Sequence, residues 1–175
     1  MYGKIIFNIV LIIALAILQL SFFNSLPGWF SGFNAAIVAI IFILALGNFS
    51  LAFWWAVGLG IFFDVYSFSP FGFYLFSLVG MAVITNFLLV NFLTNRSLYS
   101  FMVLTIFALS SYKIFLYILN YLFKFFGAND LDLVIDMNFW LNEFKSLFVD
   151  LIAVIVVFYL VNFMSKKLKP VFLIR

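Results

Sequence analysis

Three ionisable side chains stand inside long apolar segments of this 175-residue chain, namely Asp64, Lys113 and Asp150. Two carboxylates in apolar surroundings are the groups that an intramembrane aspartyl protease would use, but neither lies in a recognisable motif for that reaction. A lysine placed between two carboxylates favours ion pairing, and any negative charge left over makes one carboxylate easier to protonate. We therefore predict a buried polar cluster of these three residues and no catalytic residue.

The rest of the composition removes most other chemistries. The chain has no Cys and no His, which excludes disulfides, thiol nucleophiles, Cys/His metal sites and the usual general base. The pair Gly58-x-Gly60 is too short for a phosphate-binding loop and lies inside an apolar segment. The net charge is +3, and the cations lie mostly near the ends of apolar segments. These features predict a protein that is not an enzyme, has no cofactor or metal, and binds no nucleic acid.

The apolar content predicts an integral membrane protein. Hydrophobic residues make up 68% of the chain and charged residues only 9%, whereas soluble domains carry about 25% charged residues. A transmembrane helix needs about 20 apolar residues. We therefore expect an all-α fold with a single membrane-embedded domain over 1–175. Its six transmembrane helices are predicted at 5–23, 33–47, 51–67, 71–93, 98–125 and 144–165, with an outer loop at 126–143.

The distribution of positive charge predicts the orientation of these helices. Six spans place both chain ends on one side of the membrane. Six cations then share that side: Lys4, Arg96, Lys166, Lys167, Lys169 and Arg175. Because loops rich in Lys and Arg stay in the cytoplasm, we expect both termini to be cytoplasmic.

This orientation sets the depth of the three ionisable groups. At about 1.5 Å per residue, Asp64 lies about one turn below the outer end of its helix and Asp150 about 9 Å below the outer end of the last one. Lys113 lies near the midplane, and its stem reaches outward. Each group has a simpler interpretation that stays open: Asp64 in contact with water at a helix end, Lys113 reaching the outer headgroups, and Asp150 at the interface near Lys145.

The predicted outer loop contains acidic and apolar residues together. One interpretation is a loop or short helix at the level of the headgroups, with Trp140 as its interfacial anchor. The other is a docking surface for an extracytoplasmic partner. Its residues would be Asp130, Asp132, Asp136 and Trp140.

One short stretch resembles a known family. Gly60-x-x-x-Asp64, followed by Pro70 and Gly72, resembles the central signature of the MreD family of rod shape-determining membrane proteins. The segment Leu18-Gln19-Leu20 near the end of the first predicted helix is similar to the first span of that family. Length and the predicted number of spans agree with the resemblance.

The resemblance implies a non-enzymatic scaffold of the cell-elongation and peptidoglycan-synthesis machinery in the bacterial cytoplasmic (inner) membrane. Its implied partners are an MreC-like scaffold and, indirectly, an MreB-like filament and the peptidoglycan synthase. The implied fold is similar to that of the substrate-binding component of energy-coupling-factor transporters.

Two alternatives stay open. The chain could instead be the substrate-binding membrane component of a vitamin or small-molecule transporter, with the polar cluster and nearby aromatic residues forming its pocket. It could also be a structural membrane protein that shares only the fold. Aromatic residues of this kind are, however, common in interfacial belts.

Overall fold

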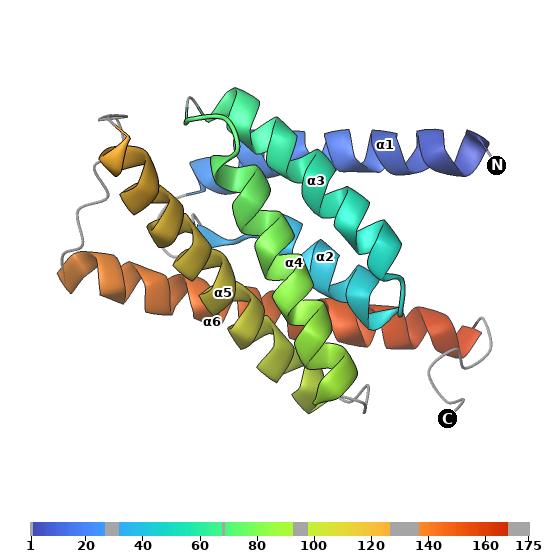
Figure 1. The fold of residues 1–175 in the computed structure, drawn as a ribbon. Helices are drawn as coiled ribbons and strands as arrows, with labels where there is room; N and C mark the ends of the chain where they lie inside the picture. Colours follow the sequence, from blue (N-terminus) through green and yellow to red (C-terminus); the bar gives the residue numbers. More distant parts are fainter. Residues whose placement is uncertain (1, 27–31, 68, 93–97, 127–136, 168–175) are drawn as a thin grey trace.

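The computed structural model describes residues 2–26, 32–67, 69–92, 98–126 and 137–167, and within these ranges it is built from helices (Figure 1). In chain order, the α-helices are α1 Tyr2–Ile17, α2 Ala35–Ala45, α3 Phe49–Tyr66, α4 Phe73–Asn91, α5 Leu98–Phe125 and α6 Met137–Lys167. Helix α1 continues into a π-helical turn at Leu18–Phe22 and a 3-10 turn at Phe23–Ser25.

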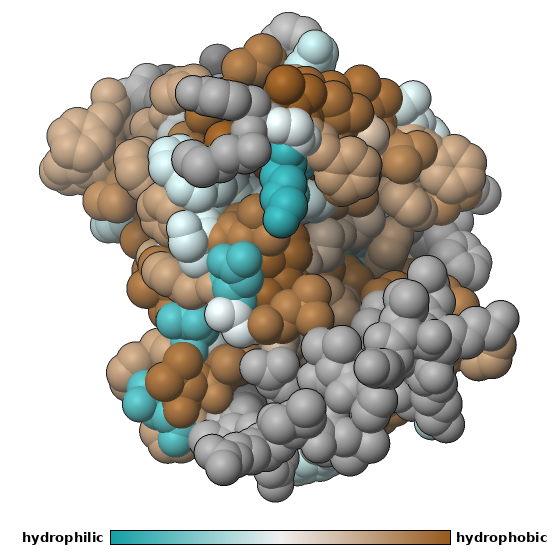
Figure 2. Space-filling view, turned by 90° about the vertical axis from the view of Figure 1, so that its right-hand side faces the viewer, coloured by the Kyte–Doolittle hydropathy of each residue, from teal (hydrophilic) through white to brown (hydrophobic). Residues whose placement is uncertain are grey.

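The surface of this bundle is suited to lipid. Within the described residues, four helical segments are long and apolar enough to cross a membrane: Gly3–Ser25, Phe49–Tyr66, Phe73–Asn91 and Leu98–Phe125. Large hydrophobic side chains are exposed along all of them, and Figure 2 shows mostly hydrophobic residues over the coloured part of one face. Soluble monomers rarely expose apolar surface on this scale. The chain is therefore a multi-pass α-helical membrane protein.

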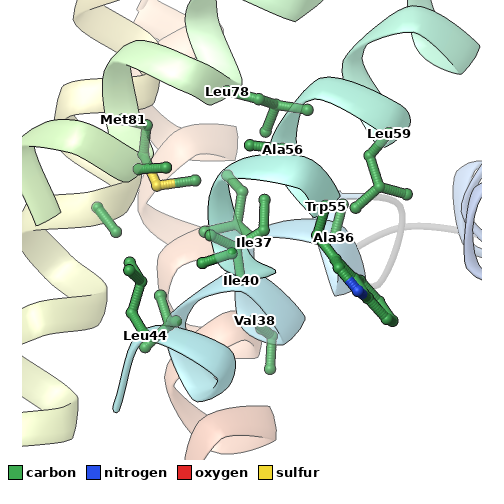
Figure 3. Close-up of a cluster of buried hydrophobic side chains, with 14 of the residues drawn as sticks. Ala36, Ile37, Val38, Ile40, Leu44, Trp55, Ala56, Leu59, Leu78 and Met81 are labelled. Atoms are coloured by element: carbon green, nitrogen blue, oxygen red, sulfur yellow. The ribbon is translucent and has the colours of Figure 1, made fainter. Parts of the chain in front are cut away.

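Helix α2 lies at the centre of the bundle. It has 11 residues, of which eight are buried, and it contacts each of the other five α-helices. Figure 3 shows Ile37, Ile40 and Leu44 of α2 surrounded by side chains such as Leu78 and Met81 of α4. At 1.5 Å per residue α2 is about 16 Å long, roughly half of the hydrocarbon core. Such a helix cannot cross the hydrocarbon core by itself, so polar groups at an end that lies within the core need partners inside the protein.

Local sequence signals explain two helix starts. Asn34 caps α2, because its side chain accepts a hydrogen bond from the N–H of Ile37 at 3.2 Å. Asn48 caps α3 in the same way, through the N–H of Leu51 at 3.1 Å. Asparagine is favoured at this position because its side-chain oxygen satisfies an N–H that has no partner within the helix.

The last helix starts earlier than its predicted span. The span was predicted at 144–165, but α6 begins at Met137, so residues 137–143 of the predicted outer loop are helical. Polar residues such as Asn142 and Glu143 lower the hydropathy of this turn without preventing helix formation. Hydropathy marks the apolar part of a helix and not its first residue.

Because consecutive helices run in roughly opposite directions, α2, α4 and α6 begin at the same end of the bundle. In Figure 1 the beginning of α1 and the end of α6 both lie at the right, whereas α2, α4 and α6 begin towards the left. We call the left-hand end, where α2, α4 and α6 begin, the polar end. The first N–H groups of α2, α4 and α6 and the positive ends of their dipoles lie there.

Candidate functional site

At the polar end, the carboxylate of Asp64 holds the start of α4. Its Oδ2 atom accepts hydrogen bonds from the backbone N–H groups of Gly72 at 2.9 Å and Leu75 at 3.3 Å. Its Oδ1 atom accepts from the N–H of Tyr74 at 2.7 Å. Asp64 is only 4% exposed. An acid of α3 therefore supplies the cap that α4 lacks, and its negative charge faces the positive end of the α4 dipole.

Two glycines make this contact geometrically feasible. A Cβ on Gly60 would lie 2.5 Å from the Cα of Leu75, so the absence of a side chain lets α3 approach the backbone of α4. Gly72 has φ of +100°, a conformation that side-chain-bearing residues rarely adopt. The carbonyl of Pro70 accepts a hydrogen bond from the N–H of Phe73 at 3.1 Å and completes the turn. The four motif residues Gly60, Asp64, Pro70 and Gly72 thus form one structural unit, which we call the α3–α4 corner.

A second acid holds the start of α2. The Oδ1 atom of Asp150, on α6, accepts a hydrogen bond from the backbone N–H of Asn34 at 2.8 Å. Asp150 is only 1% exposed. The two acids predicted to lie inside the spans therefore have the same role. Asp64 binds the start of α4 and Asp150 binds the start of α2.

Gln19 joins the end of the α1 segment to the same helix start. Its Oε1 atom accepts from the N–H of Ala35 at 2.8 Å, and its Nε2 atom donates to the carbonyl of Phe33 at 2.8 Å and to Oδ1 of Asn24 at 3.2 Å. Gln19 lies in the π-helical turn, and such turns often occur at functional sites. Its amide therefore satisfies backbone groups on both sides of Asn34, the residue that caps α2.

A cavity of about 290 Å³ lies beside this helix start, between α5 and α6. Its lining combines two charged groups, several hydroxyls and apolar side chains. The lining residues are Gly32, Asn34, Leu109, Ser110, Tyr112, Lys113, Ile114, Tyr117, Ser146, Leu147 and Asp150.

The structure brings together two of the three residues of the predicted polar cluster. Lys113 and Asp150 both line the cavity. Asp64 is not among the lining residues, and its two carboxylate oxygens bind the backbone of α4. At 4% exposure Asp64 is also not a carboxylate in open contact with water. The three groups thus share one end of the bundle but serve two places within it.

The predicted partner surface falls largely outside the described residues. Asp130, Asp132 and Asp136 belong to the segment that the structure does not describe. Trp140 lies within the backbone range of α6, but its side chain is not described.

Sequence reasoning missed two residues of this site. Asn34 was not singled out, although an Asn directly before an apolar run is a recognised helix-start signal. Gln19 enters the sequence analysis only through the resemblance of Leu18-Gln19-Leu20, because a polar residue near the end of an apolar segment carries no signal for a partner 16 residues further on.

Among the residues that the structure describes, no three Asp, Glu, His or Cys side chains gather as a metal site would require. The fold and the polar end define a class, an α-helical multi-pass membrane protein whose buried acids hold helix starts. Comparisons with known proteins add no particular identity, since no family model, no curated protein and no solved structure matches the chain.

Proposed function

We propose that the protein is a non-enzymatic membrane scaffold of the bacterial cell-elongation machinery, with six spans and both termini in the cytoplasm. The observation that carries this proposal is the α3–α4 corner. Gly60, Asp64, Pro70 and Gly72, the residues of the resemblance to the MreD family, each have a structural task there. A motif that builds a fixed corner at a membrane surface suits a docking role.

The α3–α4 corner also exposes aromatic side chains. Phe71 is 70% exposed and Tyr66 is 62% exposed. Aromatic residues are enriched where protein interfaces gain most of their binding energy. On this proposal, Phe71 and Tyr66 contact the extracytoplasmic, MreC-like partner.

Co-purification from the native host tests this proposal. A tagged chain should recover an MreC-like protein, and Phe71→Ser with Tyr66→Ser should reduce that recovery at least about tenfold, as the loss of two anchors predicts. The matched control is Phe92→Ser, an aromatic residue that is 71% exposed at the opposite end of α4. Depletion of the protein should round the host cells. Cells that stay rod-shaped after complete loss would contradict the proposal.

The proposed topology has a separate test. Because the chain has no Cys, a single introduced cysteine gives an unambiguous label. On intact spheroplasts, a membrane-impermeant maleimide should label Phe71→Cys and should label Phe92→Cys only after lysis. The reverse pattern would contradict cytoplasmic termini.

The alternative function, a substrate-binding component of a small-molecule transporter, rests on a different observation. The 290 Å³ cavity and its Lys113 and Asp150 would form the binding pocket. Ligand pockets in proteins commonly combine apolar walls with a few polar groups, as this cavity does. A metabolite that co-purifies with the protein and is identified by mass spectrometry would favour this function over the scaffold.

A further inference from the structure

The cavity is lined by residues of both α5 and α6. Away from the polar end these helices pack tightly: the rings of Phe101 and Phe158 are 5.3 Å apart, and Val154 is only 1% exposed. The cavity lies between the two helices on the side of Val154 towards the start of α6. Two of its lining residues, Ser110 and Ile114, are exposed on α5, so the cavity opens on the side of the bundle.

The lining of this cavity carries both signs of charge. Lys113 of α5 contributes an ammonium group and Asp150 of α6 a carboxylate. A ligand that is only anionic is attracted by the lysine but repelled by the aspartate, and a ligand that is only cationic meets the opposite problem. A ligand with both an anionic and an ammonium group complements both residues at once. Charged residues within a membrane cost free energy and usually have a function, which supports a binding role for Lys113 and Asp150.

The remaining lining suits the uncharged part of such a ligand. The hydroxyls of Ser110 and Ser146 can donate to or accept from its oxygen atoms. Leu109, Ile114 and Leu147 supply apolar wall for carbon atoms.

We propose that this cavity binds a zwitterionic group, with the anionic part near Lys113 and the ammonium part near Asp150. Two sources offer this chemistry. One is the headgroup of phosphatidylethanolamine, which enters sideways from the bilayer past Ser110 and Ile114. The other is a water-soluble zwitterion. This binding goes beyond the scaffold function, because it needs no protein partner.

Native mass spectrometry of the full chain in dodecyl maltoside tests the proposal. The probes are phosphatidylethanolamine, phosphatidylglycerol with the same acyl chains, and glycerophosphoethanolamine, which is the soluble headgroup alone. Phosphatidylethanolamine should bind at least about tenfold more tightly than phosphatidylglycerol, because only its ammonium group can pair with Asp150. Asp150→Asn should remove that preference, whereas Lys113→Gln should weaken the binding of both phospholipids. The control is Lys124→Gln, which changes another lysine of α5 outside the cavity lining and should leave binding unchanged.

A second variant guards against misfolding. Ser110→Phe places a large side chain at the exposed mouth and keeps both charges, so the protein should fold normally but lose binding. If phosphatidylethanolamine binds and glycerophosphoethanolamine does not, the natural ligand comes from the bilayer. If glycerophosphoethanolamine binds with an affinity similar to that of the lipid, the natural ligand is a soluble zwitterion. Equal binding of the two phospholipids, unchanged by Lys113→Gln and Ser110→Phe, would overturn the proposal, as would no binding of any probe.

Discussion

The carboxylate of Asp64 accepts a hydrogen bond from the backbone N–H of Gly72 at 2.9 Å, and the same carboxylate binds two further N–H groups in the first turn of α4. This contact explains why an apolar segment retains an acid. The start of α4 needs acceptors for its N–H groups, and Gly72 has no side chain to provide one.

Removing the cap should destabilise the protein. In Asp64→Ala one buried and two part-buried hydrogen bonds to backbone N–H groups are lost, at about 1–3 kcal/mol each, so the free energy of unfolding should fall by several kcal/mol. In Asp64→Asn one carbonyl oxygen remains but the charge at the helix start is lost, so a loss of about 2 kcal/mol is expected. Chemical denaturation in detergent micelles measures both. Equal stability of Asp64→Ala and the wild type would refute the capping role.

Close approach of α3 and α4 should make Gly60 intolerant of any side chain. The Cβ in Gly60→Ala would lie 2.5 Å from the Cα of Leu75, which forces the helices apart and should cost about 1–3 kcal/mol. Gly3→Ala is the matched control, because its Cβ would meet no atom within 4 Å. Thermal unfolding followed by circular dichroism compares the two. If both variants unfold at the same temperature, the close approach does not limit stability.

The amide of Gln19 should be needed to hold α2. Gln19→Leu leaves the N–H of Ala35 without its acceptor and should lower the free energy of unfolding by about 1–3 kcal/mol. Asn91→Leu provides the control, since Asn91 is exposed and, among the residues that the structure describes, its side chain binds the carbonyl of Phe87 in its own helix. A change within about 0.5 kcal/mol is expected there. The same denaturation assay compares the two variants. If Gln19→Leu does not lower the free energy of unfolding, the hydrogen bonds of Gln19 do not stabilise the start of α2.

Exchange of charge between Asp64 and Lys113 should not rescue the protein. An ammonium group has no acceptor atom, so Asp64→Lys leaves the α4 start uncapped whatever residue stands at position 113. The double variant Asp64→Lys with Lys113→Asp should therefore be at least as unstable as Asp64→Lys alone. Expression level and detergent stability report the result. Recovery in the double variant would show that a direct Asp64–Lys113 pair matters after all.

Much of the helical framework was predictable from the sequence because its signals are local. The segment predicted at 51–67 became α3 at Phe49–Tyr66, and the one predicted at 98–125 became α5 at Leu98–Phe125. Apolar runs of this length have few other stable conformations in a membrane, since helices satisfy their own backbone. The start of α6 at Met137 was not predicted, because polar residues in its first turns lower the local hydropathy.

The sequence by itself determined the membrane class, most of the helices and the presence of costly acids within them. Only the tertiary structure decided what those acids bind. Asp150 meets the N–H of Asn34, 116 residues away, and Asp64 meets the start of α4 instead of Lys113. A carboxylate can satisfy an ammonium group or a helix start with similar benefit, and residue type does not distinguish them. The choice follows from which helix starts the packing of the bundle brings within hydrogen-bonding distance.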